Sequence, residues 1–202
     1  MTDLIRAFIA ISLPEPLVGF ISEVQQKLKA PGLRISWVPP GNVHMTLKFL
    51  GDIEPADIDP IVAVMAECAK GVSPLRLSTG IPGVFPDLRR PRVVWLGITG
   101  DLPRLIDLHQ KLDAGLAVLG NGRFKPEDRP FKGHLTLGRI KDKQDSDILI
   151  KALKAAGQIA SQTFTADAVH LIQSRLTQSG AIYTLLRRVV LNNSVVIVNC
   201  EN

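Results

Sequence analysis

The chain has 202 residues, of which 46% are hydrophobic and 21% charged, and its formal net charge is +5 at pH 7. This length predicts a single domain with its own core, and the composition excludes a disordered chain. Its apolar runs are too short to span a bilayer and its first residues lack a secretory signal, so we expect a soluble cytoplasmic protein. Cys68 and Cys200 are too few for a disulfide framework or a cysteine metal site.

The basic charge is concentrated in one segment, residues 121–143, which has a net charge of +4. Its basic residues are Arg123, Lys125, Arg129, Lys132, Arg139, Lys141 and Lys143. Such a concentration is expected at a site for phosphate-bearing ligands, because Lys and Arg attract anions. A solvated loop is an equally good interpretation of the charge alone.

In chain order, the first half predicts alternating strands and helices. A short apolar run predicts a buried strand at 6–12, and apolar residues at helical spacing predict a helix at 17–28. Alternation within 37–52, after a Pro-Pro-Gly-Asn turn, predicts a half-buried strand. A helix at 55–69 and a strand at 75–81 follow.

The second half continues this pattern. It predicts a loop at 83–91, then strands at 92–99, 133–140, 163–176 and 181–190, with helices at 101–119 and 146–156. No regular βα repeat and no linker are visible, so we expect one α+β domain with mainly antiparallel sheets.

One motif occurs twice without a gap, 90 positions apart. His44-Met-Thr-Leu-Lys-Phe-Leu-Gly-Asp aligns with His134-Leu-Thr-Leu-Gly-Arg-Ile-Lys-Asp. In a strand, side chains alternate between faces, so His44 and Thr46 share one face, while Met45, Leu47 and Phe49 are expected on the core face with Lys48 opposite. His134 and Thr136 share a face in the same way.

Two imidazoles and two hydroxyls converge if the repeats pack with pseudo-two-fold symmetry. Imidazole titrates near neutrality, so one His can act as general base and the other as general acid in a displacement at phosphorus. The hydroxyls of Thr46 and Thr136 can donate to phosphate oxygens as charge develops there. A single such motif is best explained by β-propensity and a satisfied histidine, but its duplication favours catalysis. His109 and His170 have no repeat partner and are interpreted as structural.

These motifs resemble the 2H phosphoesterases, and most closely the branch of RNA 2',3'-cyclic phosphodiesterases, also called bacterial 2'-5' RNA ligases. The resemblance covers nearly the whole chain. The segments that carry it are Arg6-Ala-Phe-Ile-Ala-Ile, the stretch from Trp37 to Gly51, Gly83-Val-Phe-Pro, the stretch from Arg89 to Gly97, the stretch from Arg129 to Arg139, and Ser174 with Gly180 and Tyr183.

The resemblance implies a bilobal fold with an active-site groove between two pseudo-symmetric lobes, helices on the outside, and one motif in each lobe. It implies hydrolysis of RNA 2',3'-cyclic phosphate ends to 2'-phosphates, reversible 2'-5' ligation, and no metal or nucleotide cofactor. His44 would be the acid, His134 the base, and Thr46 and Thr136 would bind phosphate. Arg139 matches a basic position of the family, although strict alternation places it on the core face.

Two further expectations concern the surroundings of the motifs. The family usually has Pro where this chain has Gly133, which predicts a looser start of the second motif strand. Trp37 or Phe131 is a candidate to stack a base, with core packing as the alternative for both. The candidate RNA contacts of the basic segment are Arg123, Lys125, Arg129, Phe131 and Lys132.

Two other classes of protein compete with this hypothesis. A His-ligated metallohydrolase needs a third ligand, and no HxH, HExxH or clustered Asp/His motif is present in the sequence. A non-catalytic RNA-binding module explains the basic segment but not two equally spaced His/Thr pairs. We therefore expect a monomeric enzyme acting on RNA or nucleotides with cyclic phosphate ends, away from membranes.

Overall fold

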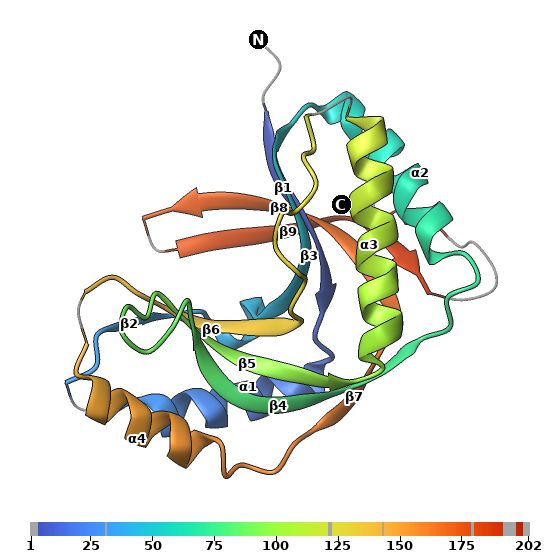
Figure 1. The fold of residues 1–202 in the computed structure, drawn as a ribbon. Helices are drawn as coiled ribbons and strands as arrows, with labels where there is room; N and C mark the ends of the chain where they lie inside the picture. The colour runs from blue at the N-terminus through green and yellow to red at the C-terminus, as the bar shows by residue number, and fades with distance from the viewer. Residues whose placement is uncertain are drawn as a thin grey trace.

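The computed structural model describes residues 4–30, 32–120, 123–142, 144–178, 180–191 and 197–199. Within these ranges the chain forms two five-stranded sheets and four α-helices (Figure 1). Lys143 and Cys200 lie outside the described residues.

Each sheet carries one of the two repeated motifs. The first sheet has the order β10-β9-β8-β1-β3 and the second β2-β6-β5-β4-β7, and every strand pairing recorded is antiparallel. The strands of the first sheet are β1 (Ile5–Ser12), β3 (His44–Ile53), β8 (Ala168–Thr177), β9 (Gly180–Val190) and β10 (Ile197–Asn199). Those of the second are β2 (Ile35–Trp37), β4 (Leu75–Phe85), β5 (Val93–Gly100), β6 (His134–Ile140) and β7 (Thr163–Ala166). The predicted α+β class with mainly antiparallel sheets is confirmed.

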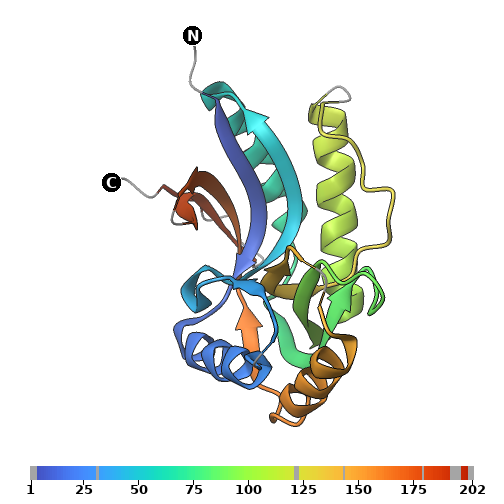
Figure 2. The ribbon, with the colours of Figure 1, turned by 90° about the vertical axis from the view of Figure 1, so that its left-hand side faces the viewer.

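The helices divide between the sheets. In Figures 1 and 2, α1 (Glu15–Leu28) and α4 (Ser146–Ala156) lie together against the second sheet. The other pair, α2 (Ile58–Ala69) and α3 (Leu102–Leu119), packs beside the first sheet. Each sheet thus has a pair of helices packed against it, and α3 contacts β3 of the first sheet as well as β4 of the second.

Local sequence explains where these elements begin. The side chain of Asp145 accepts hydrogen bonds from the backbone N–H groups of Asp147 and Ile148 and so caps α4, which begins at Ser146 as predicted. The motif strands begin at their histidines, and the core-facing Met45, Leu47, Leu135 and Leu137 are all buried in one continuous core. The two sheets therefore share a single core.

Several predicted boundaries are wrong. The expected loop at 83–91 begins later, because β4 continues through Gly83 to Phe85, paired with β5. The expected strand at 163–176 is divided into β7 and β8, which belong to different sheets. The short strands β2 and β10 were not predicted, and a 3-10 turn at Pro55–Asp57 precedes α2. No helix in the described part of the chain combines the length and apolar character needed to cross a lipid bilayer.

Candidate active site

The structure brings the four predicted residues of the repeats into the wall of one cavity of about 620 Å³. His44 and Thr46 come from β3 of the first sheet, and His134 and Thr136 from β6 of the second. Further lining residues are Arg6, Phe8, Asn42, Phe49, Phe85, Arg139, Ser174, Leu176 and Tyr183. We call this cavity the groove.

The two imidazoles are held in the same way. His44 Nδ1 lies 2.8 Å from the carbonyl oxygen of Asn42, and His134 Nδ1 lies 2.7 Å from that of Lys132. Each partner is the residue two positions before the histidine. Because a carbonyl only accepts hydrogen bonds, each Nδ1 carries the proton, and the lone pair of each neutral ring is on Nε2. Both rings thus keep Nε2 for chemistry.

Aromatic rings hold the imidazoles in place. His44 stacks on Phe8 with ring centroids 4.6 Å apart. The Tyr183 ring meets His44 edge-on, with centroids 5.2 Å apart. His134 meets Phe85 edge-on at 5.0 Å. No site role was predicted for Phe8 or Phe85, because an apolar residue in a strand has the same pattern whether it fills a core or flanks a histidine.

Burial lowers the pKa of both histidines below the ordinary value of 6.5. The backbone carbonyls act in the opposite direction, and nearby cations lower the pKa further. For His44 these are Arg139 and His134, and for His134 they are Lys132 and Arg139. The groove therefore favours neutral imidazoles until an anion enters it.

A β-bulge occurs at the same point of both motifs. Along β3, Lys48 pairs with Ile9 and Thr46 with Ala10, which leaves Leu47 as an extra residue. Along β6, Gly138 pairs with Val94 and Thr136 with Trp95, which leaves Leu137 extra. Because a bulge inserts one extra residue, the side chains that follow it point to the opposite face of the sheet from the one that strict alternation predicts.

The bulges correct two expectations based on strict alternation. Arg139 is exposed and lines the groove instead of facing the core. Phe49, its counterpart in the first motif, is 58% exposed and also lines the groove, and Lys48 takes the core-side position. Alternation failed here because an extra residue in a strand leaves no mark in the hydrophobic pattern.

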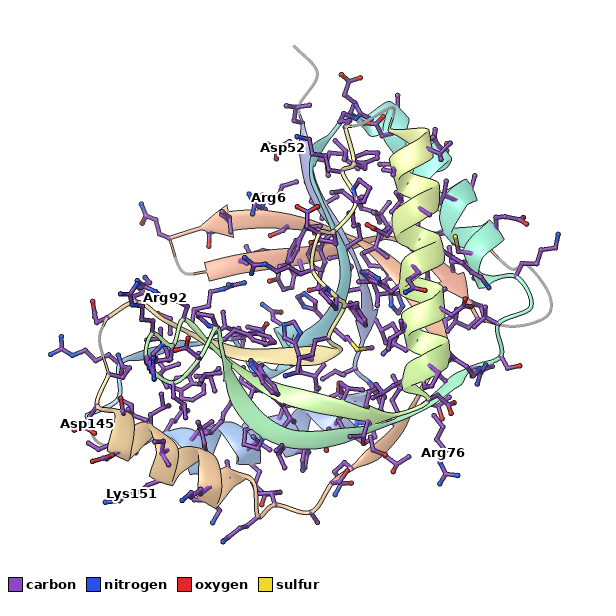
Figure 3. All side chains as sticks on the ribbon, in the orientation of Figure 1. Arg6, Asp52, Arg76, Arg92, Asp145 and Lys151 are labelled. Atoms are coloured by element: carbon purple, nitrogen blue, oxygen red, sulfur yellow. The ribbon has the colours of Figure 1, made fainter. Side chains whose placement is uncertain are left out.

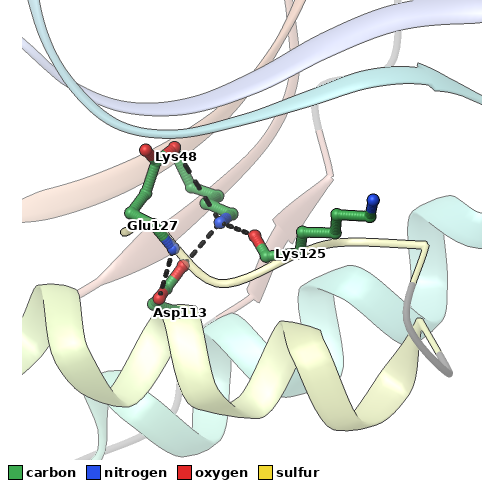
Figure 4. A network of polar contacts seen from close by, with 4 residues as sticks. All are labelled: Lys48, Asp113, Lys125 and Glu127. Carbon is green, nitrogen blue, oxygen red and sulfur yellow. Dashed lines mark hydrogen bonds and ion pairs between the residues drawn. The ribbon is translucent and has the colours of Figure 1, made fainter. Parts of the chain in front are cut away.

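Lys48 is only 3% exposed, and its charge is neutralised by a polar network (Figure 4). Its Nζ donates to Asp113 Oδ1 on α3 at 2.5 Å and to the carbonyl of Lys125 at 2.5 Å, and lies 4.0 Å from Glu127. Asp113 in turn accepts from the N–H of Glu127 at 3.0 Å. This network fixes the segment 123–133 against β3 and α3.

The candidate RNA contacts are divided by the structure. Arg129, Phe131 and Lys132 line a second cavity of about 700 Å³, which shares Thr46, Phe49, Phe85, Val93 and His134 with the groove. Arg123 and Lys125 line neither cavity. Arg123 forms an ion pair with Asp57 at 2.5 Å, and Lys125 contributes its carbonyl to the Lys48 network.

Other residues singled out in the sequence have structural surroundings. Trp37 lies in β2 and packs against the core, outside both cavities. Phe131 also packs against the core, stacked on His109 at 4.2 Å. Gly133 lies at a closely packed point, where a Cβ would be 3.3 Å from Leu105 and 3.5 Å from Met45, and the looser start of β6 stays a prediction.

Within the described ranges, no group of three or more His, Cys, Asp or Glu side chains is placed to hold a metal ion. The polar side chains that line the groove carry imidazoles, hydroxyls, guanidinium groups and the amide of Asn42. Such groups bind and protonate anions, and a phosphate ester fits them well.

Comparison with known proteins agrees with this chemistry. Residues 13–178 match the model of the 2'-5' RNA ligase superfamily. The chain is 35% identical over 180 residues to an RNA 2',3'-cyclic phosphodiesterase of Methanothermobacter thermautotrophicus, covering 89% of this chain and 95% of that protein. A second protein with that name, from Aquifex aeolicus, is 33% identical, covering 90% and 95%.

Solved structures share the fold. The structure of TT0787 of Thermus thermophilus superposes with a TM-score of 0.73 at 28% identity, covering 92% of this chain and 97% of that one. E. coli LigT complexed with 3'-AMP superposes with a TM-score of 0.73 at 25% identity, covering 94% and 99%.

Proposed function

The chain belongs to the 2'-5' RNA ligase superfamily, and from this we propose that it hydrolyses RNA 2',3'-cyclic phosphate ends to 2'-phosphates by metal-independent acid/base catalysis between His44 and His134. The observation that carries the proposal is the matched pair of imidazoles, one on each sheet, each held through Nδ1 and facing one groove. The two sheets would act as pseudo-symmetric lobes of one domain spanning residues 1–202.

The proton transfers follow from the tautomers. Nε2 of neutral His134 takes a proton from water as the water oxygen bonds to phosphorus. The bond from phosphorus to O3' breaks on the opposite side, and protonated His44 gives its Nε2 proton to O3'. The 2'-phosphate keeps its bond to O2', so the product isomer reports which bond was broken.

One neighbouring cation supports this division of roles. Arg139 disfavours a proton on both imidazoles, whereas Lys132 disfavours a proton on His134, which suits a base. The acid must be charged, and the negative charge of a bound phosphodiester favours the imidazolium form of His44 in the complex. Thr46 and Thr136 donate to the non-bridging oxygens, and Arg139 compensates the charge that develops on them.

Metal independence is supported by the kind of side chains in the groove, which are proton donors and proton acceptors without carboxylate ligands. RNA would enter past Arg129 and Lys132, which line the cavity beside the groove. Contact of Arg123 and Lys125 with RNA stays a prediction. We further propose that the protein acts as a monomer in the cytoplasm.

The test uses a 2',3'-cyclic mononucleotide and variants of each imidazole. His44→Ala and His134→Ala should each lower kcat by about 100 to 10,000-fold, and the double variant by little more, because the losses of a catalytic unit do not add. His170→Gln, outside both cavities, is the matched control. EDTA should leave the rate unchanged, and a strict requirement for added metal would contradict the mechanism. A 3'-phosphate product would contradict the proposed bond cleavage.

A further inference from the structure

The side chain of Lys132 rests on two aromatic rings next to His134. Its Nζ lies over the Trp95 ring, 4.5 Å from the ring centroid, and 5.4 Å from the centroid of Phe85. The two rings are 5.0 Å apart, and the Phe85 ring also meets His134 edge-on at 5.0 Å. The cation, the two rings and the imidazole therefore form one cluster, which we call the Lys132 cluster.

Trp95 offers this cluster the face of its ring. A buried indole usually donates its N–H to a partner, but Trp95, 9% exposed, has no hydrogen-bond partner for Nε1 within the described residues. Gly83 pairs with Trp95 across β4 and β5 and makes room for the indole, because a Cβ at this position would collide with the ring. The indole is therefore accommodated for its π surface and not for its hydrogen bond.

The rings hold the ammonium without neutralising it. Lys132 is exposed, and in the described part of the chain it forms no ion pair with a carboxylate. A carboxylate would cancel the positive field of the ammonium at the imidazole, whereas an aromatic face attracts a cation and leaves its charge intact. Lys132 therefore acts on His134 as a full and localised positive charge.

The first motif carries no cation at the equivalent position. In each motif, the residue two positions before the histidine provides the carbonyl that holds Nδ1. This residue is Lys132 in the second motif and Asn42 in the first. The Asn42 side chain is neutral, and its amide donates to the carbonyl oxygen of Ala181 at 3.1 Å. The pseudo-symmetric pair of imidazoles thus differs by one positive charge.

This difference fits the two roles in the proposed function, on which the inference rests. We propose that the ring pair positions the Lys132 ammonium so that His134, rather than His44, acts as the base. A base must stay neutral until it takes the proton of the attacking water, and a cation beside it opposes earlier protonation. Phe85 and Trp95 are then positioning residues, because they act on the reaction through this cation.

The pKa of His134 supports the assignment. Burial is the largest cause of its lowering, and Lys132 lowers it more than Arg139 does. Arg139 also lowers the pKa of His44, so it does not separate the two imidazoles. The charge that separates them is that of Lys132.

Other charged or titratable side chains share the two cavities with His134. In the groove these are Arg6, His44, Arg139 and Tyr183. In the second cavity they are Lys48, Arg92, His109, Glu127 and Arg129. Arg92 offers a matched control, because it is an exposed cation near the tip of the second sheet (Figure 3) and its guanidinium donates to the carbonyl oxygen of Lys141 at 3.3 Å.

The experiment measures kcat/KM for uridine 2',3'-cyclic phosphate, which does not titrate between pH 5 and pH 7. Lys132→Met should lower the ratio of the value at pH 5 to the value at pH 7 by about threefold, because His134 then takes up a proton more readily. Lys132→Arg keeps the charge and stacks on aromatic rings, so it should keep the wild-type ratio. Arg92→Gln should also keep it.

Trp95→Leu tests the rings. Without the indole face the ammonium is free to move into water, so the same ratio should fall by about twofold. In the Lys132→Met background this substitution should leave the ratio unchanged, because no cation remains to be positioned. A merely structural role of Trp95 would instead lower kcat/KM equally at both pH values.

A second measurement needs no tryptophan variant. Protons held over an aromatic face are shifted to higher field by the ring current. The Cε protons of Lys132 should show this shift in the NMR spectrum of wild-type protein containing carbon-13-labelled lysine, with Lys132→Met identifying the signal.

The possible outcomes separate the inference from the proposed function. An unchanged ratio in Lys132→Met, a Trp95→Leu effect that persists in that background, or a Lys132 signal without a ring-current shift would overturn the inference. A Lys132→Met protein with higher kcat/KM above pH 7 would also overturn it, because His134 would then be the acid. Wild-type protein that does not hydrolyse the cyclic mononucleotide at any pH would overturn the proposed function itself.

Discussion

Each catalytic side chain works within a small set of contacts, and these contacts make its contribution testable. The imidazoles are fixed by carbonyls two residues earlier and by stacked or edge-on rings. The threonines lie on the same face of the same strands, before the bulges, so strict alternation applies to them. Their hydroxyls are therefore the simplest groups to remove without disturbing the fold.

Thr46→Val and Thr136→Val keep the β-branched shape and delete the hydroxyl. If the hydroxyl binds most strongly as charge develops on phosphate oxygens, kcat should fall more than KM rises. Steady-state kinetics on a cyclic mononucleotide check this, with the serine variants expected to recover much of the rate. A change confined to KM would mean that the hydroxyls bind the ground state and the transition state equally.

The pH dependence follows from the directions of the two pKa shifts. In the free enzyme the pKa of both His44 and His134 is lowered from 6.5. The base is lost as pH falls through its pKa and the acid is lost as pH rises through its own, so kcat/KM should peak on the acid side of pH 6.5. In the pH profile of kcat, the alkaline limb should lie at higher pH than in the profile of kcat/KM, because the bound phosphate stabilises the imidazolium form of the acid. A kcat/KM optimum well above pH 7 would contradict this assignment.

At the scale of secondary structure elements, the buried cation Lys48 ties the segment 123–133 to α3, in addition to the core packing of Phe124 and Phe131. Burial acts to raise the pKa of Asp113, but the hydrogen bonds from Lys48 and from the Glu127 N–H lower it overall. The same segment ends at Lys132, whose carbonyl holds His134. The Lys48 network thus connects α3 to the geometry of a catalytic residue.

Lys48→Met should cost about 3 kcal/mol of unfolding free energy, because it leaves the largely buried Asp113 without its partner. It should also lower kcat, since the carbonyl of Lys132 loses its support. Denaturant unfolding and kinetics measure the two effects. The matched control is Lys111→Met, which breaks an exposed pair with Asp107, 55% and 56% exposed, and should cost much less unfolding free energy than Lys48→Met, because water already screens that pair. Equal losses in the two variants would show that the buried network has no special role.

Elements with a strong local signal could be predicted from sequence. The fourth helix was predicted with both of its ends, because Asp145 caps it and its apolar residues keep the helical spacing. The three-residue strand β2 could not be predicted, because its pairing partner on β6 lies about a hundred residues away. The division of 163–176 between two sheets is likewise a tertiary property.

The candidate site follows the same rule. The histidines and threonines were visible because the motif occurs twice, and the resemblance added Arg139. Phe49 and Lys48 were assigned to the wrong faces, because a bulge is set by pairing with a neighbouring strand and not by the residues of the bulged strand alone. Phe8 and Phe85 contact the imidazoles only through the tertiary fold.

At the scale of the whole molecule, all four histidines carry a lowered pKa. Burial is the largest cause for each of His44, His109, His134 and His170. Well above pH 6.5 the folded and unfolded chains both keep these rings neutral. As pH falls below 6.5, the unfolded chain takes up protons that the folded chain resists, so unfolding becomes more favourable.

We therefore expect the unfolding free energy to be highest above about pH 7 and to fall as the pH is lowered toward 5. Denaturant titrations at several pH values measure it, and replacing His170 by Gln should reduce the slope, because one buried titrating ring is removed. Stability that rises between pH 7 and pH 5 would contradict the lowered pKa values.

Because the groove lies between the two sheets, a bound phosphate would contact both of them and hold them together. Hydroxyl and imidazole groups from β3 would hold it on one side, and those from β6 on the other. A ligand that binds the folded chain alone stabilises it by mass action, by about 2.7 kcal/mol at a hundred times its Kd. The melting temperature should therefore rise with inorganic phosphate, and this thermal shift gives a measure of site integrity that needs no turnover.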